Sequence, residues 1–271
     1  MFESHAFGSD RPRNAIARGA VVLVIASTTA LAQSGPGPVS RADLESPVVP
    51  VHEEPHHRQV FQYGTTRILD LQVPPGDLSW FHSHEWPVLY MTLGTSRVRT
   101  QNLGADWSGG GGARAPTAQA GSAPPAAQPP PARRTPRATS TTSYVEQPVT
   151  HRIENVGDGL FSAMVVVNET AGNDTTSIAD AGFDAEPELT NPWFRSYRVT
   201  LGAGETTDMH EHTTPVVIFQ AIDGKAMANG PMDFEFNRPG QWAFYDAGVG
   251  HTIENLGASS IELLEIEVRR K

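Results

Sequence analysis

The chain has 271 residues, which is room for one or two domains at roughly 100–200 residues each. A formal net charge of -10 argues against nucleic acid or an anionic membrane surface as a partner, although the same charge also serves plain solubility. The sequence contains no cysteine. That excludes disulfides, thiolate metal ligands, a cysteine nucleophile and a lipid-modified N-terminal cysteine.

The N-terminus has the three parts of a secretory signal. Arg11, Arg13 and Arg18 precede an apolar run over residues 19–26, and small residues follow as far as Ala32. The run is much shorter than the ~20 residues that cross a bilayer. We therefore expect residues 1–32 to be a signal peptide and the mature protein to be secreted or periplasmic, without stable membrane insertion. An uncleaved anchor or a disordered tail is the alternative.

Two polar tracts interrupt the remaining sequence. Residues 33–55 are rich in proline, serine and acidic residues and indicate an extended leader. The tract from about 104 to 142 holds runs of glycine and proline and almost no large apolar residues. Such a segment buries too little surface to offset its ordering entropy, so it is expected to be a disordered insertion.

Internal duplication is the strongest organisational feature. An offset of 128 places residues 67–84 on residues 195–212, and an offset of 100 places residues 151–157 on residues 251–257. The change of offset locates the polar insertion inside the first repeat. The sequence thus predicts a first domain over 56–170, a linker over 171–190 and a second domain over 191–271.

Both repeats have the pattern of antiparallel sheet. Short β-branched and aromatic runs alternate with Gly, Pro and Asn. The first repeat ends in the apolar run 164–167, and the second ends in residues 261–268, which read Ile-Glu-Leu-Leu-Glu-Ile-Glu-Val. No long stretch shows sustained helical amphipathicity. Two all-β domains of roughly 80 ordered residues follow, packed on each other through strand edges or through sheet faces.

Six of the ten histidines occupy equivalent positions in the two repeats. In a strand, residues i and i+2 face the same side, so each His-x-His pair directs two imidazoles into one space. A third histidine about 40 residues farther on, in the uninterrupted repeat, can complete a set around one metal ion. The expected metal ligands are His82, His84 and His151 in the first repeat and His210, His212 and His251 in the second.

These motifs resemble the cupin superfamily. Its first motif, a glycine followed after five residues by His-x-His, fits Gly76 and Gly204 with the histidines that follow them. Its second motif, Pro-x-Gly-x-x-His-x-x-x-Asn, fits residues 246–255 except that Asp246 replaces the proline. In the first repeat Pro148 replaces the motif glycine, which favours the second repeat as the better site. The resemblance implies two tandem cupin-type (jelly-roll) β-barrels, a bicupin.

One departure concerns the fourth ligand. Cupin sites usually add a glutamate four or five residues after the second histidine, where this chain has Val88 and Leu89 or Val216 and Val217. Glu85 and Glu211 are adjacent to ligands in sequence and by strand parity point to the opposite face. Each site is therefore expected to be three imidazoles without a carboxylate, and loss of the anionic ligand should weaken metal binding.

The resemblance implies divalent iron chemistry with dioxygen for some three-histidine members. Iron is the expected metal, and zinc, manganese, nickel and copper remain open. One hypothesis is a metal-dependent oxidoreductase, such as a dioxygenase, acting on a small molecule. The other is a non-catalytic module that binds a small molecule or a sugar, with a relic or structural metal site. No catalytic residue beyond the ligands can be named, and a homodimer is possible under either hypothesis.

Other residues carry weaker expectations. Three residues share the histidine face by parity and either line a pocket or belong to the core: Trp86, Tyr90 and Gln220. Asn155 and Asn255 are expected to fix turns, and Glu154 and Glu254 to be surface or interdomain charges. The three histidines beside the polar leader are expected to be solvated: His52, His56 and His57.

Overall fold

The computed structural model describes residues 48–109, 136–171 and 186–269. The expected signal peptide and its cleavage site lie outside these residues. Within the described ranges, no helix is long and apolar enough to cross a membrane. The described chain is almost entirely β-structure, which confirms the predicted fold class, with short 3₁₀ helices at η2 (Val51–Glu53) and η3 (Ser143–Val145).

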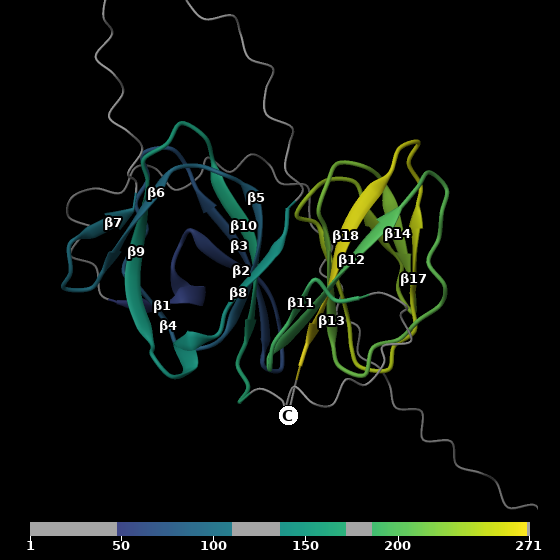
Figure 1. The fold of residues 1–271 in the computed structure, drawn as a ribbon, viewed down its shortest axis with the longest axis horizontal. Helices are drawn as coiled ribbons and strands as arrows, with labels where there is room; N and C mark the ends of the chain where they lie inside the picture. The colour runs from purple at the N-terminus through teal and green to yellow at the C-terminus, as the bar shows by residue number, and fades with distance from the viewer. Residues whose placement is uncertain (1–47, 110–135, 172–185, 270–271) are drawn as a thin grey trace, which may run out of the picture.

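The first barrel is built from two sheets of five strands each (Figure 1). One sheet has the order β1 (Val49–Pro50), β4 (His82–His84), β9 (Val149–Asn155), β6 (Val98–Asn102) and β7 (Trp107–Gly109). The other has the order β2 (His57–Tyr63), β3 (Thr66–Val73), β10 (Phe161–Asn168), β5 (Val88–Gly94) and β8 (Ala138–Thr141).

The second barrel repeats this plan with a smaller outer sheet. Its five-stranded sheet has the order β11 (Leu189–Thr190), β12 (Phe194–Leu201), β18 (Ile261–Val268), β13 (Val216–Gln220) and β16 (Trp242–Tyr245). Its three-stranded sheet has the order β15 (Phe234–Phe236), β14 (Ala226–Asn229) and β17 (Thr252–Asn255). β10 and β18 are the equivalent central strands, each pairing with neighbours on both sides.

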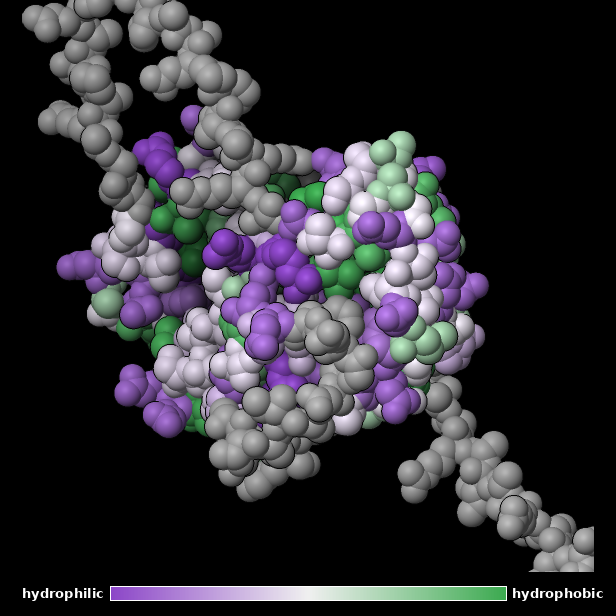
Figure 2. Space-filling view, turned by 45° about the vertical axis from the view of Figure 1, so that its right-hand side comes forward, coloured by the Kyte–Doolittle hydropathy of each residue, from purple (hydrophilic) through white to green (hydrophobic). Residues whose placement is uncertain are grey.

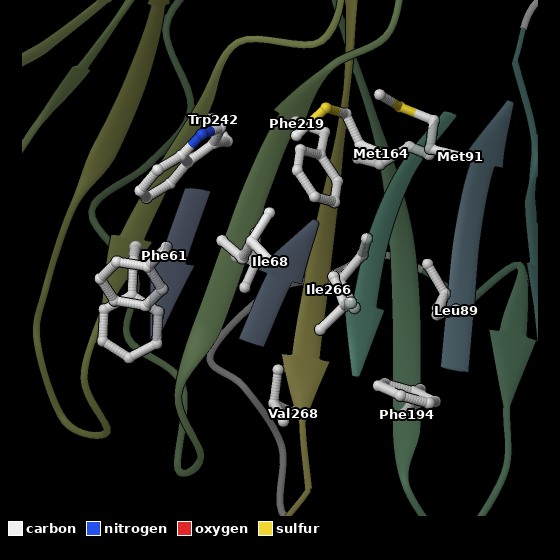
Figure 3. Packing of buried hydrophobic residues seen from close by; sticks show 14 of the residues in the cluster. Phe61, Ile68, Leu89, Met91, Met164, Phe194, Phe219, Trp242, Ile266 and Val268 are labelled. Carbon is white, nitrogen blue, oxygen red and sulfur yellow. The ribbon is translucent and has the colours of Figure 1, made fainter. Parts of the chain in front are cut away.

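The barrels pack face to face, one of the two arrangements that the sequence left open. Alternate residues of β18 point in opposite directions: Leu263 lies in the second barrel's own core, whereas Leu264 and Ile266 lie in a cluster shared with the first barrel (Figure 3). In the shared cluster the Phe61 ring lies 5.1 Å from the Trp242 ring, centroid to centroid. Burial on both faces explains the continuous apolar run over residues 163–167 of the equivalent strand β10.

Three internal cores take up most of the large apolar side chains. The face seen in Figure 2 is accordingly mostly polar, with hydrophobic residues in scattered patches. Exposed large hydrophobic residues among those described are few and dispersed along the chain, with Met209 the most exposed at 67%. The fold therefore owes its stability to the two barrel interiors and to the interface between them.

The polar tracts contribute more structure than their composition predicted. The described end of the expected leader belongs to the first barrel, because Val49 pairs in parallel with His82. The expected insertion of 104–142 includes β7 and β8, and the expected linker of 171–190 ends in β11. These strands have two to four residues and lie at sheet edges, where one face is solvated. Too few of their residues are buried to give an apolar pattern in the sequence.

Equivalent turns confirm the expected role of the two asparagines. The Asn155 amide donates hydrogen bonds to the carbonyls of Val73 and Gly159, and its oxygen accepts one from the Gly157 N–H. Asn255 repeats this arrangement with the equivalent residues of the second barrel. Each asparagine lies four residues after the third histidine and ties the end of its strand to the neighbouring turns.

Candidate metal centres

The second barrel gathers its three histidines around one carboxylate oxygen. The Nε2 atoms of His210, His212 and His251 lie 3.1, 2.7 and 3.5 Å from Oε2 of Glu265. All four residues are buried, and their ligand atoms lie within 4.8 Å of one another. His210 and His251 face each other across an antiparallel bridge, which places a His-x-His segment beside the third histidine, as the sequence analysis expected.

The expectation that this site lacks a carboxylate was wrong. Val216 and Val217 do occupy the positions after the second histidine, and they lie in hydrophobic cores. The carboxylate comes instead from Glu265 on β18, the central strand of the five-stranded sheet. One sequence signal could have found it: Glu265 and Glu267 alternate with apolar residues in a strand buried on both faces. A buried glutamate in such a strand requires a partner.

Hydrogen bonds to the far side of each imidazole orient the set. Nδ1 of His210 lies 2.9 Å from the Asp208 carbonyl, and Nδ1 of His251 lies 3.4 Å from the Val249 carbonyl. A carbonyl only accepts, so these Nδ1 atoms carry protons and hold both rings with Nε2 directed at Oε2 of Glu265.

A carboxylate holds the third imidazole of this site. Nδ1 of His212 lies 3.0 Å from Oε1 of Glu267, and the other Glu267 oxygen lies 3.4 Å from the Arg195 guanidinium. All three side chains are buried. The pair of Glu267 and Arg195 thus fixes the ring of His212 and increases the basicity of its Nε2.

The buried charges of this site stabilise one another. Burial by itself would raise the pKa of Glu265, but hydrogen bonds from His210, His212 and His251 outweigh it and hold that pKa well below its usual value. Burial lowers the pKa of His212, and hydrogen bonds to Glu265 and Glu267 more than compensate, raising it to about 9. Burial likewise lowers the pKa of His210, but its hydrogen bonds to Glu265 and to the Asp208 carbonyl outweigh this and raise that pKa. A divalent cation at the centre would meet an anionic oxygen as well as imidazoles.

The first barrel brings its three expected histidines together without a carboxylate among them. His82 on β4 pairs with His151 on β9, and their ring centroids lie 4.7 Å apart. The His84 ring lies 5.1 Å from that of His82 and 4.9 Å from that of His151. Val165 and Val167 occupy the β10 positions that correspond to Glu265 and Glu267, and both lie in the first barrel's core.

Burial leaves the first trio uncharged and its nitrogens without partners. Desolvation, with smaller effects from neighbouring histidines, lowers the pKa of His84 to about 2 and that of His151 to about 4. Within the described residues, Nε2 of His82 and both ring nitrogens of His84 are buried without a hydrogen-bond partner. Buried polar atoms are ordinarily satisfied, so these ring nitrogens are fitted to an ion or to water.

Two histidines beside the first trio were wrongly expected to be solvated. His56 and His57 are each only 3% exposed, whereas the side chain of His52 is 26% exposed. The carboxylate of Glu54 accepts hydrogen bonds from the rings of both buried histidines, at 3.0 Å from His56 Nδ1 and 2.7 Å from His57 Nδ1. Burial would raise the pKa of Glu54, but these bonds lower it to about 2. The polar composition of the segment concealed this buried network.

The remaining expected residues have separate roles. Of the two roles expected for Tyr90 and Gln220, the structure shows the core role. Tyr90 packs against the first barrel's core, and the amide of the buried Gln220 donates to the carbonyls of Ile222 and Gly224. Glu154 pairs with Arg99 as a partly exposed charge. Trp86 is 38% exposed and does line a pocket.

That pocket opens beside the first trio and has a volume of about 150 Å³. It reaches His84 and is lined by side chains from three parts of the first barrel: Pro50, Val51, His52, Ser83, Glu85, Trp86, Val88, Val167 and Glu169.

The donor sets of both sites suit a divalent metal. Three convergent imidazoles, with or without a carboxylate oxygen, are a common ligand set for zinc, copper, iron and nickel, and carboxylate donors also suit manganese. Two observations support this fit. The first trio has buried ring nitrogens without hydrogen-bond partners, and in the second set Oε2 of Glu265 is shared by His210 and His212.

No protein-family model matches this chain, and no curated protein matches its sequence. Solved structures are similar in fold. AerE from Microcystis aeruginosa is 14% identical over 77% of this chain and 90% of its own, with a TM-score of 0.50. A cupin 2 conserved barrel domain protein from Leptotrichia buccalis is 11% identical over 78% and 87%, with a TM-score of 0.44. Oxalate decarboxylase from Bacillus subtilis is 12% identical over 76% and 68%, with a TM-score of 0.42.

At these identities the likeness concerns the fold alone. The chain thus has the fold of two tandem β-barrels of the cupin type, as the sequence predicted.

Proposed function

We propose that this chain is an exported metal-dependent oxidoreductase that acts on a small molecule in its second barrel, with divalent iron as the metal and dioxygen as the oxidant. One observation carries the proposal: three oriented imidazoles surround one buried carboxylate oxygen. A relic site that no longer binds metal is disfavoured in the second barrel. Such a site would not need the buried carboxylate of Glu265 among the histidines or the second glutamate, Glu267, that holds His212.

Different residues of the second barrel would bind the metal, orient its ligands and enclose the site. His210, His212, His251 and Glu265 would hold the ion, and bound iron would supply redox chemistry with dioxygen at coordination positions that the four side chains leave open. Glu267 and Arg195 keep the His212 ring in place. The stacked ring of Tyr245, 4.7 Å from that of His251, closes another side of the site. Burial of all these groups excludes bulk water from the ligands.

Metal analysis combined with a dioxygen surrogate tests this function. The full chain is isolated, its metal content is measured, and metal-free protein is reloaded with ferrous iron under anaerobic conditions and exposed to nitric oxide. We expect one paramagnetic iron–nitrosyl species per chain, which requires an open position on iron, and its loss in Glu265→Gln. Protein that retains only zinc, or iron that does not take up nitric oxide, would overturn the proposal.

The pocket in the first barrel supports a second candidate, non-catalytic binding of a small molecule. A cavity of about 150 Å³ is of the size that accommodates a ligand such as benzene. Non-catalytic binding would be the remaining function if reloaded protein failed the nitric oxide test but still bound small molecules in this pocket. A ligand-induced thermal shift that is lost in Trp86→Ala would detect such binding.

Export, and the possible homodimer, remain parts of the proposal. Fractionation of the producing cells tests the first, and light scattering of the purified chain tests the second.

A further inference from the structure

We propose that the first barrel contributes a positioning residue to the metal centre of the second: Tyr63 holds the turn that leads into His251 by a hydrogen bond to Asp246. The inference rests on the metal-binding part of the proposed function and goes beyond it, because it makes the ligand geometry of one barrel depend on the other. Asp246 is the residue that replaces the motif proline, and Tyr63 precedes the duplicated segment of the first repeat.

The turn between β16 and β17 leads directly into His251. It begins at Asp246, the residue after β16, and the Val249 N–H donates to the Asp246 carbonyl at 3.2 Å. Gly248 within the turn has a φ of 72°, which residues with a Cβ rarely adopt. His251 immediately precedes β17. The chain therefore reaches this ligand through a turn whose first residue is Asp246.

The same turn is tied to two of the three imidazoles. The Gly248 N–H donates to the His212 carbonyl at 2.8 Å, and the Val249 carbonyl lies 3.4 Å from Nδ1 of His251. A carbonyl only accepts, so the His251 ring donates to the turn. A displaced turn would therefore move the main chain of His212 and the ring of His251 together.

The first barrel holds the start of this turn. The hydroxyl of Tyr63, the last residue of β2, donates to Oδ2 of Asp246 at 2.8 Å, while Oδ1 accepts the N–H of Ala247 at 2.9 Å. One carboxylate thus joins the main chain of the turn to the other barrel. The Tyr63 ring lies 5.2 Å from the Phe244 ring in the shared core, so the position of the hydroxyl is itself fixed by the interface.

Rigidity is the property that this contact supplies. A proline at the motif position fixes its own φ, whereas an aspartate is free to rotate unless other groups hold it. Both Asp246 and Tyr63 are half-buried, and a hydrogen bond to a carboxylate is stronger than one between neutral groups. In the first barrel the equivalent residue is the exposed Glu146, and a proline stands two residues later at Pro148.

The need for rigidity follows from metal coordination. Functional side chains must be held to within about 0.5 Å of their working geometry by the groups that support them. Asp246 is such a support for His251 and His212, and Tyr63 supports Asp246 from the other barrel. The second metal centre is therefore completed by the interface between the barrels.

Removal of one hydroxyl group tests this role. Tyr63→Phe keeps the ring that packs on Phe244, so the metal-free variant should fold and melt like wild type. Binding of Mn(II) to the metal-free full chain is measured by titration calorimetry, and the second barrel's share is the part that Glu265→Gln abolishes. Tyr63→Phe should weaken that share about tenfold, the lower end of the effect of losing a supporting partner in a metal site.

Phe61→Leu is the matched control for interface packing. The Phe61 ring lies 4.8 Å from the Phe244 ring and 5.1 Å from the Trp242 ring, in the same shared core as Tyr63. The smaller side chain should lower the Tm of the metal-free chain, because it leaves space in that core. Its affinity for Mn(II) should equal that of wild type, because the hydrogen bond to Asp246 is intact.

A double-mutant cycle shows whether Tyr63 acts through Asp246. Asp246→Ala should weaken Mn(II) binding at least as much as Tyr63→Phe does. The double variant should bind no more weakly than Asp246→Ala alone, because residues that act through one contact are not additive. A tyrosine that merely stabilised the interface would add its own effect to that of Asp246→Ala.

Three outcomes would overturn the inference: wild-type affinity in Tyr63→Phe, an equal loss of affinity in Phe61→Leu, or additive effects in the double variant. All three leave the nitric oxide test of the proposed function untouched. Conversely, iron that takes up no nitric oxide would overturn the oxidoreductase and leave this positioning role in place. A wild-type chain that binds no Mn(II) in the second barrel would overturn the inference together with the metal binding on which it rests.

Discussion

Replacing Glu265 by glutamine should remove most of the second barrel's affinity for metal while leaving the fold intact. The two side chains have nearly the same size, and the change removes the negative charge whose Oε2 lies within 3.5 Å of three imidazole nitrogens. The amide is a much poorer metal ligand than the carboxylate. Even the loss of a supporting partner typically weakens metal binding about 10- to 100-fold, so the loss of a ligand should lie at or beyond the upper end.

The expected effect can be expressed as stability. A metal at a concentration of 100 times its Kd stabilises the folded state by about 2.7 kcal/mol, and a hundredfold weaker Kd reduces that contribution to about 0.4 kcal/mol. For a protein of this size, each kcal/mol shifts Tm by about 2–4 °C. Metal should therefore raise the Tm of wild type by about 5–11 °C and that of the variant by about 1–2 °C.

Calorimetry with and without Mn(II) measures this difference. Manganese is chosen because the histidine trio of the first barrel includes no carboxylate. Glu211→Gln is the control: Glu211 is exposed and lies between His210 and His212, so its removal changes the local charge without touching the ligand set. An equal metal-induced shift in Glu265→Gln and wild type would refute the role given to the carboxylate.

Three further predictions concern the rest of the molecule. Phe219→Ala should destabilise the chain by about 3–5 kcal/mol in chemical denaturation, because Phe219 is fully buried between the barrels; a loss below about 1 kcal/mol would contradict the shared core. Replacing residues 110–135 by a short Gly/Asn linker should leave Tm within a few degrees, whereas removing all of 104–142 should lower it strongly by deleting β7 and β8; equal stability of the two deletions would show that these strands contribute nothing. N-terminal sequencing of exported protein should begin at Gln33, and an intact Met1 in a cytoplasmic fraction would contradict export.

The sequence by itself determined the duplicated all-β architecture and the six histidines of the repeat. Both follow from local rules: strand alternation places His210 and His212 on one side, and the turn asparagines Asn155 and Asn255 recur at a fixed distance after the third histidine. Such features depend on neighbours a few residues apart. The histidine spacing and the asparagine position each occur twice, once in each repeat, so a chance arrangement does not explain them.

The tertiary structure decided which other residues join these histidines. Glu265 lies more than 50 residues beyond His210 and His212, and it reaches them only because β18 is the central strand of the sheet that faces them. Glu54 and His57 lie in a segment whose polar composition indicates solvent, yet a short 3₁₀ turn and the start of β2 direct them into the barrel. Strand parity tells which face a residue is on, but pairing between distant strands determines what it meets there. The carboxylate of the second site and the buried network beside the first trio were therefore beyond local sequence patterns.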